Sequence, residues 1–349
     1  MRDQFSARQL LPHADVALNY HLGLKPEEQL VIAWDETVSV HVYDAFRAVA
    51  ALQHDQTTAV TYAPFAEHLI QEYGVFAGRS LKEPLNIPPV LLATLEAADA
   101  FVLLGSDTEI LFSPDLKELL DKGKRGIFLP YHSAFNAYRM LFQTEEEARH
   151  QSELIRAVGQ IVDQEAEVRV TSEEGTDLRF TIGRFRTLQR DGAVQSGQLQ
   201  ILPAGSIARV PDPGSVYGTL VVDRTVCADD YKELHEPIYL EVEANRVVSI
   251  HGGMEAKLLR TFLERLNDER AFNLTELGVG TNPLCKWSGI GAPSEDTHVQ
   301  GTIAFALGCD THLGGETDGP AHVDMTMRFP TLEIGGTTVT ADGQLQITV

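Results

Sequence analysis

His322 and Asp324 lie two residues apart in the C-terminal part of the chain and place an imidazole next to a carboxylate. On a β-strand, positions i and i+2 point to the same face, so these side chains can converge on one metal ion. A third ligand must come from another segment, and Glu276, in the run 275–282 that we expect to be a glycine-rich turn, is the obvious carboxylate. The alternative is that His322 and Asp324 lie on a solvated strand face, and that Glu276 is an exposed loop charge or lies beside a helix C-cap.

Three further histidines are candidates for catalytic groups. His251 precedes two glycines at a predicted strand-to-helix corner, where it is either a structural hydrogen-bonding residue or part of a pocket. His132 follows a buried apolar run, and the carboxyl ends of strands in open parallel sheets face ligands. His312 lies in the loop after the strand-like run 301–308, where an exposed position is the alternative to a role in the site. We expect His298, which follows an acidic pair, to be a solvated loop residue.

The elements that must position these residues differ between the two halves of the chain. In the first half, short apolar runs alternate with stretches of helical spacing; the runs are 30–34, 100–104 and 126–129, and the helical stretches are 38–52, 91–98 and 114–121. Strands separated by helices predict crossover connections and a parallel sheet. No glycine-rich nucleotide-binding motif follows any of these runs.

After a connecting helix predicted at 145–162, the pattern becomes mostly β. One helix, predicted at 254–266, interrupts strand-like runs at 167–171, 177–182, 218–223 and 238–243, and the stretch 321–349 is β again with a hairpin turn at 341–343. We therefore predict an α/β fold in two domains. Residues 1–160 form an α/β domain with a parallel sheet, and residues 161–349 form a mostly β, metal-binding catalytic domain.

Composition excludes several classes of function. The chain has 349 residues, and 28 Lys and Arg against 50 Asp and Glu give a net charge of −22. Such a field repels phosphate backbones and anionic bilayers, so we expect no nucleic-acid partner and no membrane partner. The three cysteines are widely spaced, which predicts no disulfide framework, and no run approaches 18 apolar residues. The expected location is the cytoplasm.

Six segments, taken in their order along the chain, carry a resemblance to a known family. They are Glu-Gly-Thr-Asp-Leu (174–178), Pro-Ala-Gly (203–205), Glu-Leu-Gly-Val-Gly-Thr-Asn (276–282), Gly-Thr-Ile-x-Phe-Ala-Leu-Gly (301–308), Gly-Gly (314–315) and His-x-Asp (322–324). This set resembles the aminopeptidase T family of metallopeptidases. A narrower similarity, on the run 250–260 and on Leu-Asn-Asp (266–268), is to 2,5-dihydroxypyridine 5,6-dioxygenase, a non-haem iron ring-cleaving enzyme on the same scaffold.

The resemblance to the peptidases implies two metal ions, but this chain departs from it. The shared ligands fall on Glu276 and on the pair His322 and Asp324. The peptidase's other glutamate falls on Ser206 and its second histidine falls on Ala304, while an assisting tyrosine falls near Thr311. Neither serine nor alanine can hold a second divalent ion, so one metal ion per chain is expected.

The resemblance to the dioxygenase implies a triad of two histidines and one carboxylate, which leaves positions on Fe(II) open for substrate and O₂. One histidine of that triad falls on Glu276, which gives one histidine and two carboxylates here. Carboxylate ligands shift the metal preference of such a site towards Fe(II), Mn or Mg and away from copper. A further histidine of the dioxygenase, an expected acid or base, falls near Phe112, which puts an identical substrate in doubt.

These observations favour a mononuclear metal enzyme that acts with O₂ on a small cyclic or aromatic substrate. Its expected ligands are Glu276, His322 and Asp324, with Fe(II) as the preferred ion and Mn or Zn as alternatives. The rival hypotheses are a metal-dependent hydrolase related to the aminopeptidases and a non-catalytic binding protein. His312 could replace a lost ligand. The resemblance also implies a homo-oligomer, most simply a dimer.

Overall fold

The computed structural model of the chain describes residues 5–63, 86–105, 110–111, 113–130, 133–228, 230–287 and 293–349. Two residues named above, Phe112 and His132, lie outside the described residues. The chain divides into two compact units. Among the described residues, the first unit contains 5–63, 86–152 and 190–204, and the second contains 153–189 and 205–349, each with the gaps given above.

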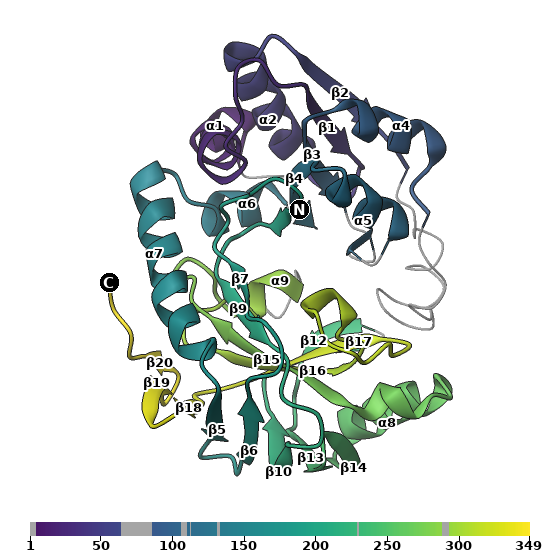
Figure 1. Ribbon diagram of the computed structural model, residues 1–349, viewed down its shortest axis with the longest axis vertical. Coiled ribbons are helices and arrows are strands. Elements are labelled where there is room, and N and C mark those ends of the chain that lie inside the picture. The colour runs from purple at the N-terminus through teal and green to yellow at the C-terminus, as the bar shows by residue number, and fades with distance from the viewer. Residues whose placement is uncertain are drawn as a thin grey trace. The chain divides into compact units, whose positions relative to one another are not determined.

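Sheet A of the first unit is parallel throughout (Figure 1). Its strand order is β2 (Thr57–Thr61), β1 (Leu30–Trp34), β3 (Ala100–Gly105), β4 (Arg125–Pro130) and β8 (Leu199–Ile201). The strand β3 is buried along its whole length, as expected of a central parallel strand that is covered on both faces.

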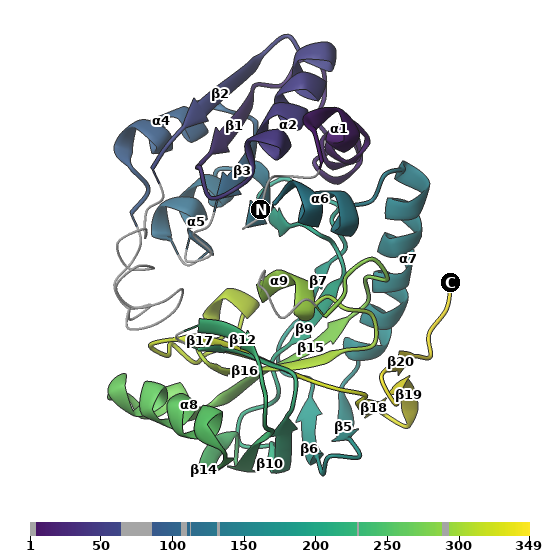
Figure 2. The same ribbon diagram turned by 180° about the vertical axis from the view of Figure 1, so that it is seen from behind.

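Helices cover both faces of sheet A (Figures 1 and 2). They are α1 (Ala7–Val16), α2 (Val40–Gln53), α4 (Pro89–Ala97), α5 (Pro114–Asp121) and α6 (Ala134–Met140). Leu95 of α4 and Leu119 of α5 pack in one apolar cluster with Phe101 of β3. The helices α1, α2 and α6 contact one another, and α2 also contacts β1. The predicted N-terminal α/β architecture with a parallel sheet is confirmed.

The second unit contains two sheets whose described pairings are antiparallel. Sheet B has the order β14 (Arg246–Gly252), β13 (Ile238–Glu243), β10 (Tyr217–Val222), β6 (Asp177–Ile182), β5 (Ala166–Thr171), β18 (Thr331–Ile334), β19 (Thr337–Ala341) and β20 (Gln344–Leu345). Sheet C has the order β12 (Asp230–Glu233), β11 (Thr225–Ala228), β17 (His322–Met327), β16 (Ile303–Gly308), β15 (Leu274–Gly280), β9 (Ser206–Arg209) and β7 (Leu188–Arg190).

One apolar core joins sheets B and C. Phe180 of β6 meets Phe305 of β16 edge to face, with ring centroids 6.2 Å apart. The helices α7 (Glu145–Val162) and α8 (Met254–Arg265) add Val158 and Phe262 to the same cluster. Successive side chains of a strand point to opposite faces of the sheet. The large apolar side chains of sheet C point towards this core, and the residues between them point to the other face.

Most predicted elements of the second half appear at the expected residues. The hairpin turn at 341–343 is present between β19 and β20, where Asp342 and Gly343 have φ of 48° and 72° and Ala341 pairs with Gln344. The predicted division into two domains, 1–160 and 161–349, stays a prediction. The first compact unit also contains residues 190–204, which include the sheet A strand β8.

The glycine-rich turn predicted at 275–282 is wrong, because residues 274–280 form β15, an interior strand of sheet C. Its glycines mark close contacts rather than a bend. A Cβ at Gly280 would lie 2.2 Å from the carbonyl oxygen of Val299, so no larger residue fits there. Glycine inside a strand is typical of positions where another backbone approaches closely.

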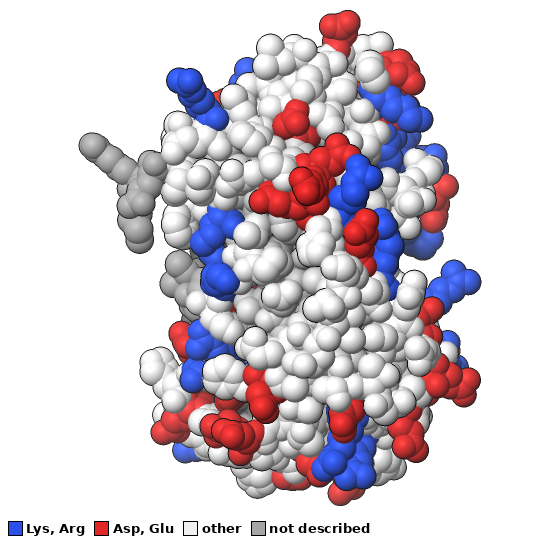
Figure 3. Space-filling view, turned by 90° about the vertical axis from the view of Figure 1, so that its left-hand side faces the viewer, with Lys and Arg blue, Asp and Glu red and all other residues white. Residues whose placement is uncertain are grey.

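The surface charge is mixed on the face that Figure 3 shows. Lys and Arg side chains there are interspersed with Asp and Glu side chains. Within the described part of the chain, no helix is both long enough and apolar enough to cross a membrane.

A buried histidine in the first unit makes stability depend on pH. His21 is 3% exposed, and its Nδ1 contacts the carbonyl oxygen of Gly192 at 3.2 Å. Burial lowers the pKa of His21 from 6.5 to about 4, against the opposing effect of the Gly192 carbonyl. The native state therefore favours the neutral ring.

We expect this histidine to destabilise the protein as the pH falls. Its contribution is intact above pH 6.5 and is lost as the pH falls through about 4, because the unfolded chain takes up the proton first. A shift of this size corresponds to about 3 kcal/mol of unfolding free energy. Urea titrations between pH 7 and pH 4 check this. His21→Gln should flatten the profile, and an unchanged profile in that variant would contradict the assignment.

Candidate metal centre

Strands β15, β16 and β17 lie side by side in sheet C and carry the three predicted ligands on one face. Asp324 of β17 pairs with Ala306 of β16, and Ala306 pairs in turn with Glu276 of β15. His322 lies two residues before Asp324 on the same strand and faces the same side. The structure thus brings together side chains from two segments that are far apart in the sequence.

The polar atoms of these side chains converge on the ring of His322. Its Nε2 lies 3.3 Å from Glu276 Oε2 and 3.4 Å from Asp324 Oδ1. The His322 and Glu276 side chains are only 13% and 12% exposed, so the alternative that Glu276 is an exposed loop charge is wrong. Burial opposes the imidazolium, but the charges and hydrogen bonds of Asp324 and Glu276 raise the pKa of His322 well above its ordinary value. The carboxylates therefore favour a positive charge at this point.

Small residues on the neighbouring positions make room for the cluster. Gly278 of β15 pairs with Ala304 of β16, and Gly308 of β16 pairs with His322. A Cβ at Gly278 would lie 3.1 Å from the Cβ of Ala304 and 3.5 Å from Glu276 Oε1. Because Ala306 carries only a methyl group, the longer side chain of Glu276 can reach across β16 towards β17.

A backbone carbonyl fixes the orientation of the His322 ring. The Nδ1 atom lies 2.6 Å from the carbonyl oxygen of Cys309, which can only accept a hydrogen bond. Nδ1 is therefore the protonated nitrogen, and in the neutral ring Nε2 keeps its lone pair towards the two carboxylates. A carbonyl that holds the remote nitrogen in this way is typical of metal-binding histidines.

The structure places His312, one of the histidines predicted from the sequence, beside the predicted ligands. His312 lies in the short 3-10 helix Thr311–Leu313, and its ring meets that of His322 edge to face with centroids 4.6 Å apart. One ligand atom each from Glu276, His312 and His322 lies within 4.8 Å of the other two, the one such metal-compatible group found among the described residues. The alternative of a fully exposed loop histidine is wrong, because His312 is half-buried.

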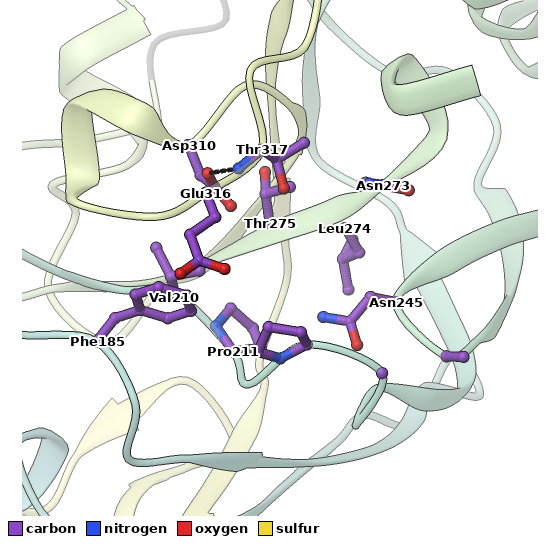
Figure 4. Close-up of a pocket in the computed structure, with 13 residues that line it drawn as sticks. Phe185, Val210, Pro211, Asn245, Asn273, Leu274, Thr275, Asp310, Glu316 and Thr317 are labelled. Atoms are coloured by element: carbon purple, nitrogen blue, oxygen red, sulfur yellow. Dashed lines mark hydrogen bonds between the residues drawn. The ribbon is translucent and has the colours of Figure 1, made fainter. Parts of the chain in front are cut away.

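The loop that carries His312 is built around the buried carboxylate of Asp310, at the edge of a pocket of about 240 Å³ (Figure 4). Asp310 Oδ1 accepts a hydrogen bond from the backbone N–H of Thr317 at 2.7 Å. The backbone carbonyl of Asp310 accepts two more, from the N–H groups of Leu313 and Gly315. A Cβ at Gly315 would lie 2.3 Å from Asp310 Cγ, so glycine is required there. These contacts determine the position from which His312 approaches His322.

Two other histidines singled out from the sequence, His251 and His298, are not members of this cluster. His251 is exposed on β14, the edge strand of sheet B, and its Nε2 contacts Ser249 Oγ at 2.7 Å. His298, predicted to be solvated, is fully buried, and its Nδ1 lies 3.2 Å from Thr297 Oγ1. No sequence motif marks this burial, because it depends on contacts made in the folded chain. The His298 N–H donates to the Glu295 carbonyl, and the His298 carbonyl accepts from the Asn282 N–H.

The positions where the peptidases place further ligands carry no metal-binding side chains here. Ser206 is buried on β9 and pairs with Gly280, while Ala304 lies on β16 opposite Gly278. Thr311, where the peptidase tyrosine falls, is exposed.

Comparisons with known proteins identify the family of the chain and its fold. The family model for 2,5-dihydroxypyridine 5,6-dioxygenase matches residues 19–347. The 2,5-dihydroxypyridine 5,6-dioxygenase of Pseudomonas putida KT2440 is 28% identical over 246 residues, which cover 68% of this chain and 69% of that protein. The solved structure of the P. putida dioxygenase has a TM-score of 0.79 at 22% identity and covers 98% of both chains. Wild-type AmpT from Thermus thermophilus has a TM-score of 0.67 at 15% identity, covering 97% of this chain and 99% of that one, which shows a shared fold.

We expect Asp310 to stabilise the loop mainly as a hydrogen-bond acceptor. Asp310→Ala leaves the Thr317 N–H without its partner and should cost about 1–3 kcal/mol of unfolding free energy. Asp310→Asn keeps an acceptor oxygen and removes a charge whose burial raises the pKa of Asp310, so it should cost less. Urea unfolding of the metal-free variants measures both values. Equal losses in the two variants would show that the charge, rather than the acceptor, matters.

Proposed function

The chain belongs to the 2,5-dihydroxypyridine 5,6-dioxygenase family, and from this premise we propose that it is a mononuclear, Fe(II)-dependent oxygenase that cleaves the ring of a small cyclic or aromatic substrate. Family membership favours an oxygenase over an aminopeptidase. The metal, its ligands and the substrate are the finer parts of the proposal, and each is argued below.

The convergence of Glu276 and Asp324 on His322 Nε2 carries the proposal. We propose these three residues as ligands of one divalent ion. One nitrogen and two carboxylate groups fit Fe(II), with Mn or Zn as alternatives. The donor set also fits electrically, because two carboxylates offset the two charges of the ion, and the raised pKa of His322 reports the same attraction for positive charge.

The residues around the ion have separate tasks. The Cys309 carbonyl holds the His322 ring so that Nε2 faces the ion, and the small side chains on β15 and β16 leave room for the ligand side chains. When bound, Fe(II) with open coordination positions supplies the place where an oxygenase brings substrate and O₂ together. The buried setting of His322 and Glu276 limits competing water.

Among the predicted catalytic histidines, His312 has the support of proximity to His322. His251 is exposed on the other sheet, and its catalytic role stays a prediction, as does that of His132. As substrate we propose a dihydroxylated aromatic ring, and 2,5-dihydroxypyridine, which the relatives' name supplies, is the first probe. A dimer and a cytoplasmic location stay predictions from the sequence.

We expect purified protein that is loaded anaerobically to hold one Fe(II) per chain and to consume O₂ when given dihydroxylated aromatic compounds. His322→Ala should abolish both properties because it removes the nitrogen ligand. His235→Ala, an exposed histidine of the same unit, is the matched control and should change neither. Elemental analysis and an oxygen electrode measure the two quantities. Two tightly held ions per chain, or no O₂ uptake with any ring tested, would contradict the proposal.

We expect aminopeptidase activity to be absent or very weak. Two-metal peptidases use one ion to activate water and the other to hold the substrate, and Ser206 and Ala304 cannot complete a second site. Release of p-nitroaniline from aminoacyl substrates measures this activity. Robust release that disappears in His322→Ala would favour the hydrolase hypothesis instead.

A further inference from the structure

We propose that His312 is a further direct ligand of the metal ion, which adds a second imidazole to the proposed ligands Glu276, His322 and Asp324. This inference rests on the proposed function, since it concerns the same ion. The 3-10 helix Thr311–Leu313 would then supply a ligand to the metal centre, as strands β15 and β17 do.

The first argument is distance. Bonds of about 2.1 Å that meet at angles between about 90° and 110° put ligand atoms about 3.0 to 3.4 Å apart. Glu276 Oε2 and His322 Nε2 are 3.3 Å apart, within this range. His312 offers a ring nitrogen within 4.8 Å of a ligand atom of each partner, so the three side chains present donor atoms to the same small volume.

The second argument is the way in which the loop holds His312. The Asp310 hydrogen bonds to Thr317, Leu313 and Gly315 close a compact turn around it. Cys309, the residue just before Asp310, supplies the carbonyl that orients His322. One loop therefore positions both imidazoles, and a rearrangement of that loop would move both together.

The third argument is chemical. With Glu276, His322 and Asp324 alone, the ion has one nitrogen donor. Addition of His312 gives the ion a second imidazole, and imidazole and carboxylate donors together are typical of non-haem Fe(II) oxygenases. In the dioxygenase pattern the second histidine falls on β15, at the position of Glu276. In this chain β15 supplies the carboxylate of Glu276, and the second histidine, His312, comes from the 309–317 loop. Asp324, 3.4 Å from His322 Nε2, remains the second carboxylate ligand.

The rival explanation is that His312 only packs against His322, since the two rings meet edge to face. The variants His312→Phe and His312→Ala separate these roles. Phenylalanine keeps an aromatic ring but has no nitrogen, whereas alanine loses both. His235→Phe is the control for a change of an exposed histidine.

The experiment is an anaerobic titration of the full-length protein with Co(II), read by its visible absorption and by competition with a chelator. If His312 is a ligand, His312→Phe and His312→Ala should both weaken binding by at least about 10–100-fold, the loss seen for disturbed metal sites. Co(II) affinity equal to wild type in His312→Phe would overturn the inference and leave the proposed function intact. Wild-type protein that binds no Co(II) or Fe(II) would instead refute the proposed function itself.

A measurement on unmodified protein covers variants that fail to fold. X-ray absorption of the Co(II)-loaded wild type should show scattering from two imidazoles in the first coordination shell. A count of one imidazole would overturn the inference.

Discussion

The alternation of side chains on strands β15, β16 and β17 is the constraint on which the rest of the second unit depends. One face of these strands carries residues such as Phe305, which pack against sheet B and stabilise the fold. The other face carries Glu276 and Asp324 on either side of Ala306. A shift of one residue in the pairing would send the carboxylates into the apolar core, so the burial that stabilises the fold also keeps the site in register.

The spacing of His322 and Asp324 predicted a shared strand face, because a two-residue period follows from strand geometry alone. Glu276 was named as the third ligand, yet its strand was taken for a turn, since the glycines of 275–282 are turn formers in isolation. Their role depends on backbone contacts, as at Gly280 against Val299, that the sequence does not display. The burial of His298 was missed for the same reason. The position of His312 depends on the hydrogen bonds of Asp310, which form only in the folded loop.

The chain keeps the fold of its relatives while its metal-binding positions change. Where the peptidase pattern expects ligands, Ser206 and Ala304 are buried and paired within sheet C, so the sheet is continuous at both positions. The remaining donors are grouped around His322, whose ring is held by a carbonyl and faced by two carboxylates. We propose that this arrangement holds one ion, and the oxygenase function agrees with the family to which the chain belongs.

The most direct test of this account is a crystal structure of the Fe(II)-loaded protein, prepared without oxygen and measured at the iron absorption edge. The account predicts one anomalous peak per chain above sheet C, about 2.0–2.2 Å from ligand atoms of Glu276 and His322. A peak elsewhere on the chain, or a pair of peaks about 3.5–4 Å apart as in two-metal enzymes, would contradict it.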